Sequence, residues 1–292
     1  MSTPPSATPP PSAYLIGLAL VFACDSPEAK GACEALGVCE APRPPPEDFT
    51  ILCDATPGST CGAMALDEAL HAVLVRAVTR PGSAIHVWNV SDNAAEVARA
   101  TIPEPPRRVR SAERHRAQEV ERLRRELREA ATPAISAGAE LRRSPVARTV
   151  TRIARSTVAR GVRRHLVILS DLRELTTPGG LDLECPRRLP SLDRIAAYLA
   201  PRSLLPAGSL AGRSVTIIAR ELPRIPTRRR CELSLRRLDE LVAVWTSVLE
   251  GAGASVSVRP EPGADMFDAG DTHPGDNGTM TAEAAGTSRG SR

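Results

Sequence analysis

The feature that most constrains the fold of this chain is a series of short apolar segments that alternate with stretches in which apolar residues recur at helical spacing. The most apolar of these segments, HLVILSD at 165–171, is predicted to be a central strand. Further strands are predicted at 49–53, 84–90, 98–102, 214–219 and 255–258, and helices at 64–78, 111–131, 144–158, 191–200 and 232–250. Strands that alternate with helices predict an α/β fold with a doubly wound, mostly parallel sheet and helices on both faces.

Changes in composition divide the chain, which has 292 residues, into four parts. Residues 1–24 resemble a signal peptide, because an apolar run of h-region length at 13–23 is followed at once by a cysteine. The Pro-rich segment 25–47 is predicted to be an extended linker, and 48–261 to be the folded domain. The tail 262–292 has almost no large apolar residues and is predicted to be disordered.

The segment from Val21 to Cys24 resembles the lipobox of bacterial lipoproteins, in which a small residue precedes a cysteine that becomes lipidated. The resemblance implies an exported protein that is anchored to the membrane of the bacterial cell envelope through a lipid on Cys24. A cytoplasmic location is the alternative, since no Lys or Arg precedes the apolar run and Phe22 is bulky where lipoboxes have a small residue. No apolar run approaches the roughly 20 residues that span a bilayer.

The cysteine pattern fits an oxidising compartment. The chain has seven cysteines, and six remain for pairing if Cys24 carries a lipid. The candidate disulfides join Cys33 to Cys39 and Cys185 to Cys231. There is no C-x-x-C motif and the histidines are scattered, so the sequence shows no zinc-type cluster.

Two aspartates lie at the ends of predicted strands, Asp54 at the end of the first strand and Asp171 at the end of the central one. In an open parallel sheet, ligands bind at the carboxyl ends of the strands where the winding reverses, so both carboxylates are expected in one crevice. The candidate ligands are Asp54, Thr56, Ser59, Ser144 and Asp171. Such an all-oxygen set suits a hard cation such as Mg²⁺, and without one the two carboxylates would repel each other. Ser144 is also predicted to cap the helix that starts at Pro145.

The order of these elements and motifs resembles a von Willebrand factor A (vWA) domain over about residues 49–260, and in particular the bacterial vWA-domain lipoproteins. That family binds a cation at a metal ion-dependent adhesion site, with an Asp-x-Ser-x-Ser loop, a threonine from a later loop and a second aspartate. The resemblance implies that Asp54 and Asp171 take the two aspartate places. It gives Thr56 the first hydroxyl place and Ser144 the threonine place. Gly58 stands at the second hydroxyl place, so binding without a metal is the alternative.

The resemblance implies a non-enzymatic module that binds another protein, because a cation with an open coordination position accepts an oxygen from a partner. One rival hypothesis is a hydrolase, since a haloacid-dehalogenase-like phosphatase also carries its nucleophilic aspartate after the first strand. That chemistry needs a second aspartate two residues on, where this chain has Thr56. The P-loop, dinucleotide and H-E-x-x-H motifs do not occur, and G-x-S-x-G occurs only at 286–290, in the tail and not between a predicted strand and a predicted helix as a nucleophile elbow requires.

A second rival hypothesis is nucleic-acid binding. Residues 107–164 contain 17 basic and 6 acidic residues, and a basic segment of this kind can contact a phosphate backbone. The segment has no aromatic residue on which bases could stack. Its glutamates alternate with its arginines as helical ion pairs do, so a solvated helix face is the favoured interpretation and a nucleic-acid partner is not expected.

Overall fold

The computed structural model describes residues 44–56, 59, 61–91, 93–105, 112–138, 143–156, 161–174, 181, 183, 189–218, 235–263 and 266–267. The chain divides into two units, Met1–Pro44 and Pro45–Arg292, and the description below concerns the second. The predicted signal peptide, Cys24 and most of the predicted linker lie outside the described residues.

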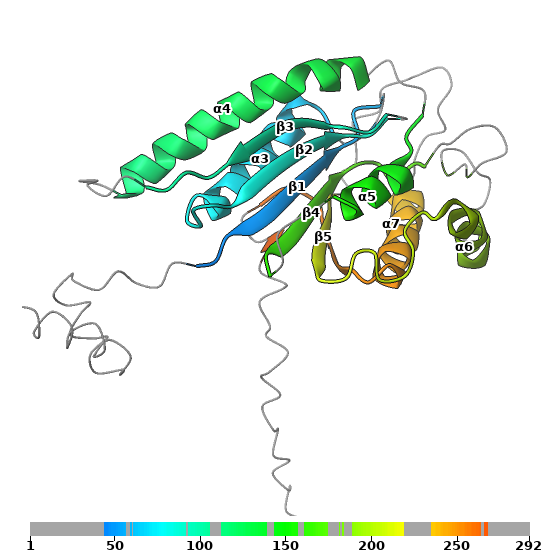
Figure 1. Ribbon diagram of the computed structural model, residues 1–292. Coiled ribbons are helices and arrows are strands. Elements are labelled where there is room, and N and C mark those ends of the chain that lie inside the picture. Colours follow the sequence, from blue (N-terminus) through cyan, green and yellow to red (C-terminus); the bar gives the residue numbers. More distant parts are fainter. Residues whose placement is uncertain are drawn as a thin grey trace, which may run out of the picture. The chain divides into compact units, whose positions relative to one another are not determined.

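Six strands form a single sheet. In spatial order they are β3 (Glu96–Thr101), β2 (Ala84–Asn89), β1 (Glu47–Cys53), β4 (Arg163–Leu169), β5 (Arg213–Ile218) and β6 (Ser255–Arg259). All neighbouring strands are parallel except β2 and β3, which pair antiparallel. This arrangement confirms the predicted doubly wound, mostly parallel α/β fold, and it places β1 beside β4 where the winding reverses (Figure 1).

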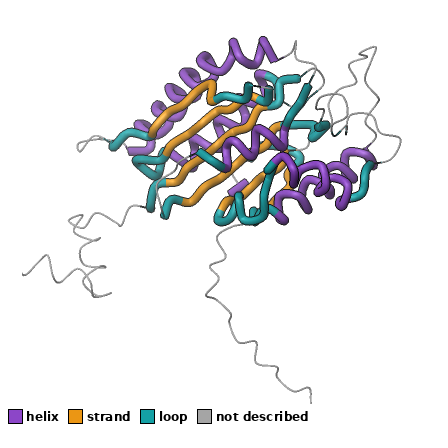
Figure 2. Tube along the Cα trace, turned by 45° about the vertical axis from the view of Figure 1, so that its right-hand side comes forward, coloured by secondary structure: helices purple, strands orange, loops and turns teal. Residues whose placement is uncertain are grey.

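Helices cover both faces of the sheet (Figure 2). They are α3 (Ala63–Ala77), α4 (Ala112–Gly138), α5 (Val146–Ala154), α6 (Leu192–Leu199) and α7 (Leu235–Gly251), with the short 3-10 helix η2 (Ala200–Arg202) after α6. The apolar sides of α3 and α4 share one core cluster, and those of α5, α6 and α7 share a second cluster on the opposite face. None of the helices in the described part is long and apolar enough to cross a membrane.

The central strand β1 shows why the sheet is buried on both sides. Phe49, Ile51 and Cys53 belong to the cluster under α3 and α4, whereas Leu52 belongs to the cluster under α5 and α7. All residues of β1 are buried, as expected for a central parallel strand whose alternate side chains each meet a helix layer. Short, almost continuous apolar runs were therefore the correct signal for the strands of this fold.

Helix α4 is longer than the predicted 111–131, because it continues through Pro133 to Gly138. The last residue of the helix makes a close tertiary contact. A Cβ atom on Gly138 would lie 2.7 Å from the Cβ of Ala55, so only glycine allows this close approach of the helix end to the loop after β1. The end of α4 therefore abuts the loop that carries the candidate ligands.

The folded core extends past the predicted boundary at residue 261. Met266 and Phe267 are buried, and they lie in the cluster on the α3 side of the sheet. The Phe267 ring packs edge-on against Phe49 at 5.3 Å and against His165 at 5.2 Å between ring centroids. Of the predicted disordered tail, the residues from 268 onward lie outside the described residues.

Candidate functional site

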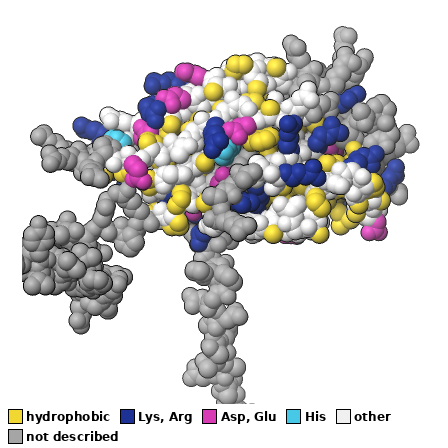
Figure 3. Space-filling model, viewed as in Figure 1, with side chains coloured by type: hydrophobic (Ala, Val, Ile, Leu, Met, Phe, Trp, Pro, Cys, Tyr) yellow, Lys and Arg dark blue, Asp and Glu magenta, His cyan; other side chains and the backbone are white. Residues whose placement is uncertain are grey.

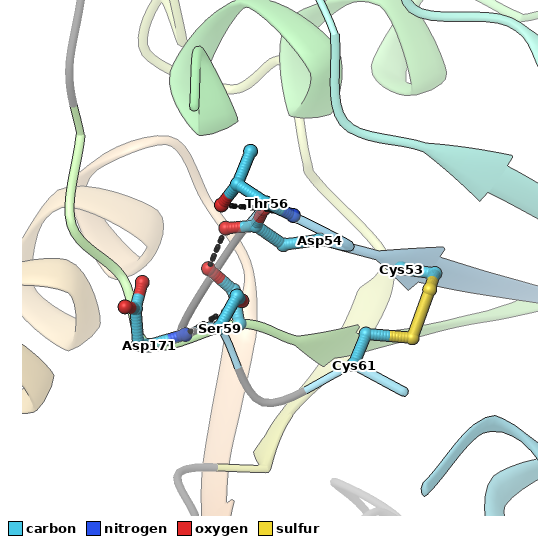
Figure 4. The surroundings of a disulfide bond; sticks show 7 residues. Cys53, Asp54, Thr56, Ser59, Cys61 and Asp171 are labelled. Carbon is cyan, nitrogen blue, oxygen red and sulfur yellow. Dashed lines mark hydrogen bonds between the residues drawn. A yellow bond between two sulfur atoms is a disulfide. The ribbon is translucent and has the colours of Figure 1, made fainter. Parts of the chain in front are cut away.

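The candidate site lies at the carboxyl ends of β1 and β4, where the two strands run side by side in parallel. Cys53 pairs with Leu169 in the strand register, and the Asp54 amide donates a hydrogen bond to the Leu169 carbonyl at 2.9 Å. The next residues on the two strands, Asp54 and Ser170, therefore enter the same crevice. Figure 4 shows Asp54, Thr56, Ser59 and Asp171 gathered at these strand ends.

The Asp54 carboxylate is fully buried, and both of its oxygens accept hydrogen bonds. Its Oδ1 accepts from the Thr56 hydroxyl at 2.7 Å and from the Thr56 amide at 3.2 Å. Its Oδ2 accepts from the Ser144 and Ser170 hydroxyls, each at 2.7 Å. These donors replace the water that a charged carboxylate loses on burial.

Ser144 does not cap helix α5, which corrects the prediction from the Ser-Pro pair. The N-cap residue is Pro145, which lies outside the helix, and the Ser144 hydroxyl donates to Asp54 instead. A residue distant in sequence satisfies the helix end, because the Ala147 amide donates to Oε2 of Glu174 at 3.0 Å. The prediction was wrong because a hydroxyl before a helix can bond to a charged group elsewhere in the fold.

Ser59 and Asp171 form the second half of the crevice. The Asp171 amide donates to the Ser59 hydroxyl at 3.4 Å, so the loop after β1 touches the end of β4. The Asp171 carboxylate accepts from the Arg173 amide on Oδ1 at 3.2 Å, and the Arg173 guanidinium Nε lies 3.3 Å from its Oδ2. Both carboxylate oxygens of Asp171 therefore face groups of the same arginine.

Glu174 is a buried carboxyl group next to the crevice. Its side chain is 0% exposed, and within the described residues its Oε1 has no hydrogen-bond partner. Burial raises the pKa of Glu174 to about 8, although hydrogen bonds from the Ala147 and Val146 amides lower it in part. The group is therefore protonated at neutral pH and brings no full negative charge to the crevice.

A disulfide between Cys53 and Cys61 closes the loop that carries Asp54, Thr56 and Ser59. The sequence analysis did not propose this pair. A useful signal was present, since the two cysteines are only eight residues apart and flank the Asp-x-Thr segment. The predicted partners Cys33, Cys39, Cys185 and Cys231 lie outside the described residues, as do Pro57, Gly58 and Thr60 of the loop itself.

The chemistry of the donor set fits a hard divalent cation. Two carboxylates and three hydroxyls supply only oxygen atoms, which are the ligands that Mg²⁺ prefers. A hydroxyl that donates its proton to Asp54 still has lone pairs available, so Thr56 and Ser144 can serve the carboxylate and a cation at once. In the described part of the chain no three His, Cys, Asp or Glu side chains converge, so such a site depends on the hydroxyls.

Three residues of the site escaped the sequence analysis, namely Ser170, Arg173 and Glu174. Ser170 was the most accessible to prediction, because it immediately precedes Asp171 at the end of the central strand. Its hydroxyl both donates to Asp54 and accepts from the Leu172 amide at 2.9 Å. The positions of Arg173 and Glu174 depend on the path of the loop, for which the sequence holds no periodic signal.

A cavity of about 440 Å³ lies between α3 and α4, away from this chemistry. It is lined by Ala63, Met64, Leu66, Asp67, Arg128, Thr132, Ile135 and Ser136. None of the five candidate ligands is among them. The candidate ligands are themselves buried, and hydrogen bonds among them organise the strand ends.

Several arginines of α4 take part in ion pairs, some at helical spacing within α4 and others with α3. Arg122 pairs with Glu119 and Glu126 on the same helix, and Arg124 pairs with Asp67 of α3. Figure 3 shows basic and acidic side chains next to each other over the start of this helix. These contacts favour the interpretation of α4 as a solvated helix face.

No protein-family profile and no curated protein matches the sequence of this chain. The strand order, with β1 beside β4 and an antiparallel β3 at the edge, is the observation that decides the fold type. The fold is vWA-like. The resemblance to the vWA family that the sequence suggested therefore holds for the architecture.

Solved structures with a similar arrangement include a von Willebrand factor type A protein from Catenulispora acidiphila, 12% identical with a TM-score of 0.36. They also include an aerotolerance-related membrane protein from Bacteroides fragilis, 11% identical with a TM-score of 0.36, and the mussel byssus proximal thread matrix protein 1, 10% identical with a TM-score of 0.30. These matches cover 77%, 73% and 71% of this chain. The chain spans 41%, 92% and 48% of the three proteins, respectively.

Proposed function

We propose that this protein is a non-enzymatic module that binds another protein at the carboxyl edge of its vWA-like sheet. The observation that carries the proposal is the convergence of hydroxyl and carboxylate groups from three distant segments of the chain. Ser144 and Ser170 reach Asp54 across 90 and 116 residues, and Ser59 reaches Asp171 across 112. The gathering of these polar groups at the carboxyl ends of β1 and β4, where open α/β sheets bind ligands, supports a binding role.

We propose Asp54, Thr56, Ser59, Ser144 and Asp171 as the residues that would hold a divalent cation such as Mg²⁺. When bound, the cation would supply a coordination position for a carboxylate oxygen of the partner. Asp54 keeps the two hydroxyls of Thr56 and Ser144 oriented, and Ser59 keeps the loop after β1 against the end of β4. The partner is expected to present an aspartate or a glutamate to this edge.

The surroundings of Asp54 favour binding over hydrolysis. A phosphatase of the haloacid-dehalogenase type requires a strand-end aspartate whose carboxylate can attack a substrate. The residue at the position of a phosphatase acid, Thr56, donates its hydroxyl proton to the Asp54 carboxylate.

We propose that the module acts in the bacterial cell envelope, where a lipid on Cys24 would anchor it to the membrane. The support is the sequence pattern around Cys24 together with the Cys53–Cys61 disulfide, since disulfides persist in oxidising compartments. In this arrangement the Pro-rich segment 25–47 would act as a spacer between the anchor and the vWA-like fold.

The experiment that tests the proposal is calorimetric titration of the full chain with Mg²⁺ and with Mn²⁺, alongside the Asp171→Ala variant. Saturable binding that is lost in Asp171→Ala is the expected result. A matched control is Asp193→Ala on α6, which removes an exposed aspartate that is not a candidate ligand and should leave binding unchanged. Equal binding by Asp171→Ala and wild type would overturn the assignment of Asp171.

A further inference from the structure

Arg173 contacts both carboxylate oxygens of Asp171, one through its backbone and one through its side chain. Its amide donates to Oδ1 at 3.2 Å, and its guanidinium Nε lies 3.3 Å from Oδ2. The Arg173 side chain is 11% exposed and that of Asp171 is 5% exposed, so solvent screens this ion pair only weakly. The Arg173 guanidinium therefore places a positive charge beside Asp171, one of the two candidate carboxylate ligands.

The loop that carries Arg173 is held in place by contacts on both sides. The Leu172 carbonyl accepts from the Trp245 indole at 2.9 Å, and the Leu172 amide donates to the Ser170 hydroxyl at 2.9 Å. On the other side, the Leu183 amide donates to the Glu174 carbonyl at 2.8 Å. The Glu174 side chain accepts a hydrogen bond from the Ala147 amide in the first turn of α5. The Arg173 backbone therefore stays near Asp171, and only its side chain is able to withdraw.

A guanidinium and a divalent cation cannot both approach Asp171 without strong repulsion, because Asp171 is buried and already faces the Arg173 guanidinium at 3.3 Å. A cation that binds must displace the Arg173 side chain or tolerate its charge within a few ångströms. Either process reduces the affinity of the site for the cation.

We infer that Arg173 is a built-in counter-ion of Asp171 that competes with the divalent cation and sets the affinity of the site. The inference rests on the proposed cation site. Arg173 would then determine the specificity for acidic partners. A partner whose carboxylate binds the Arg173 guanidinium would release that guanidinium from Asp171 and leave Asp171 more available to the cation. Cation and acidic partner would then bind cooperatively, each raising the affinity for the other.

The test is Mn²⁺ titration of the full chain, followed by the loss of the free-ion electron paramagnetic resonance signal, for wild type, Arg173→Gln and Arg173→Lys. Arg173→Gln is expected to bind Mn²⁺ about tenfold or more tightly than wild type, since it removes the charge beside Asp171. Arg173→Lys keeps the charge and is expected to remain close to wild type. Arg125→Gln, which removes an exposed arginine from α4, is the matched control and should not differ from wild type.

Thermal unfolding of each variant is measured first, and Arg173→Met, which preserves the apolar length of the side chain, replaces Arg173→Gln if the latter does not fold. If wild type and the neutral variants bind Mn²⁺ equally well and Asp171→Ala does not bind, Arg173 is not a competitor, but the cation site stands. If no protein binds Mn²⁺, the cation site itself is wrong and the inference is overturned with it. Unchanged affinity in Arg173→Gln and a tenfold gain in Arg125→Gln would likewise overturn it.

Discussion

The Ser144 hydroxyl donates a 2.7 Å hydrogen bond to Oδ2 of Asp54, which joins the segment before α5 to the loop after β1. The Ser170 hydroxyl reaches the same oxygen at the same distance. The two serines are therefore alike as partners of Asp54, but only Ser144 is a candidate cation ligand. Variants of the two serines can therefore distinguish a structural role from the proposed role in binding.

Replacement of either serine by alanine should lower the free energy of unfolding by about 1–3 kcal/mol, because each leaves a buried carboxylate without one donor. Ser144→Ala should in addition weaken Mg²⁺ binding by about tenfold or more, whereas Ser170→Ala should change it much less. Urea unfolding and calorimetry on both variants check the prediction. Equal affinities for Mg²⁺ in the two variants would contradict the assignment of Ser144 as a ligand.

The disulfide between Cys53 and Cys61 should contribute both to stability and to the site. The Cys53→Ala/Cys61→Ala double variant should lose about 2–3 kcal/mol, since the bridge closes a loop of sequence separation eight. It should also bind Mg²⁺ more weakly, because Ser59 lies within the released loop. Dithiothreitol should weaken binding in wild type but have no such effect in the double variant, and an equal effect in both would assign the change to other cysteines.

Glu174 should make the protein less stable as the pH rises. Its pKa is about 8 in the folded chain against 4.5 for a free glutamate, so its contribution is fully present below pH 4.5 and is lost as the pH rises through 8. Glu174→Gln, which cannot ionise, should therefore match wild type near pH 4.5 and exceed it by roughly 2–4 kcal/mol at pH 8.

Urea unfolding at pH 4.5, 6 and 8 tests this dependence on Glu174. Glu129→Gln is a suitable control, because Glu129 is exposed on α4 and its replacement should have little effect at any of these pH values. A difference between Glu174→Gln and wild type that stays constant with pH would show that the carboxyl group does not titrate as described.

Glu47 should stabilise the opposite end of the sheet by its charge. Its carboxylate pairs with Arg76 at 2.8 Å and lies 3.5 Å from His165. Burial alone would raise the pKa of Glu47, but the contacts with His165 and Arg76 lower it to about 2. The stabilisation is therefore present above pH 4.5 and is lost as the pH falls through 2.

Glu47→Gln should cost about 3–5 kcal/mol at pH 7, because it removes the buried negative charge that pairs with Arg76. The difference from wild type should shrink on acidification below pH 4.5, as urea unfolding at pH 7 and pH 3 can measure. Glu126→Gln, at an exposed ion pair on α4, should cost less than about 1 kcal/mol. A comparable loss in the two variants would contradict the role of burial at Glu47.

The proposed anchor predicts the behaviour of a Cys24 variant in cells. Wild type should sediment with membranes and be extracted by detergent, whereas Cys24→Ala should be soluble or remain unprocessed. Cell fractionation and mass determination of the mature N-terminus provide the measurement. Membrane fractionation that does not change in Cys24→Ala would contradict the lipoprotein proposal.

The element order of this protein follows from the sequence because it depends on local patterns. Apolar runs at 49–53, 165–171 and 214–219 predict buried strands, and each is found within two residues of its predicted start. The positions of Asp54 and Asp171 at the ends of neighbouring strands follow from the same reasoning, since the strand order is a consequence of α/β winding.

The partners of the polar groups were decided only by the tertiary structure. Ser144 donates to Asp54 instead of capping α5, and the Glu174 carboxyl group accepts from an amide at the N-terminus of α5. Cys53 pairs with Cys61. Each choice depends on which groups the fold brings within about 3 Å, and hydropathy along the chain contains no such distance. The pattern of apolar residues along the sequence thus determines the strands and helices and the end of the sheet at which a site can form. Contacts between distant segments determine which side chains build that site.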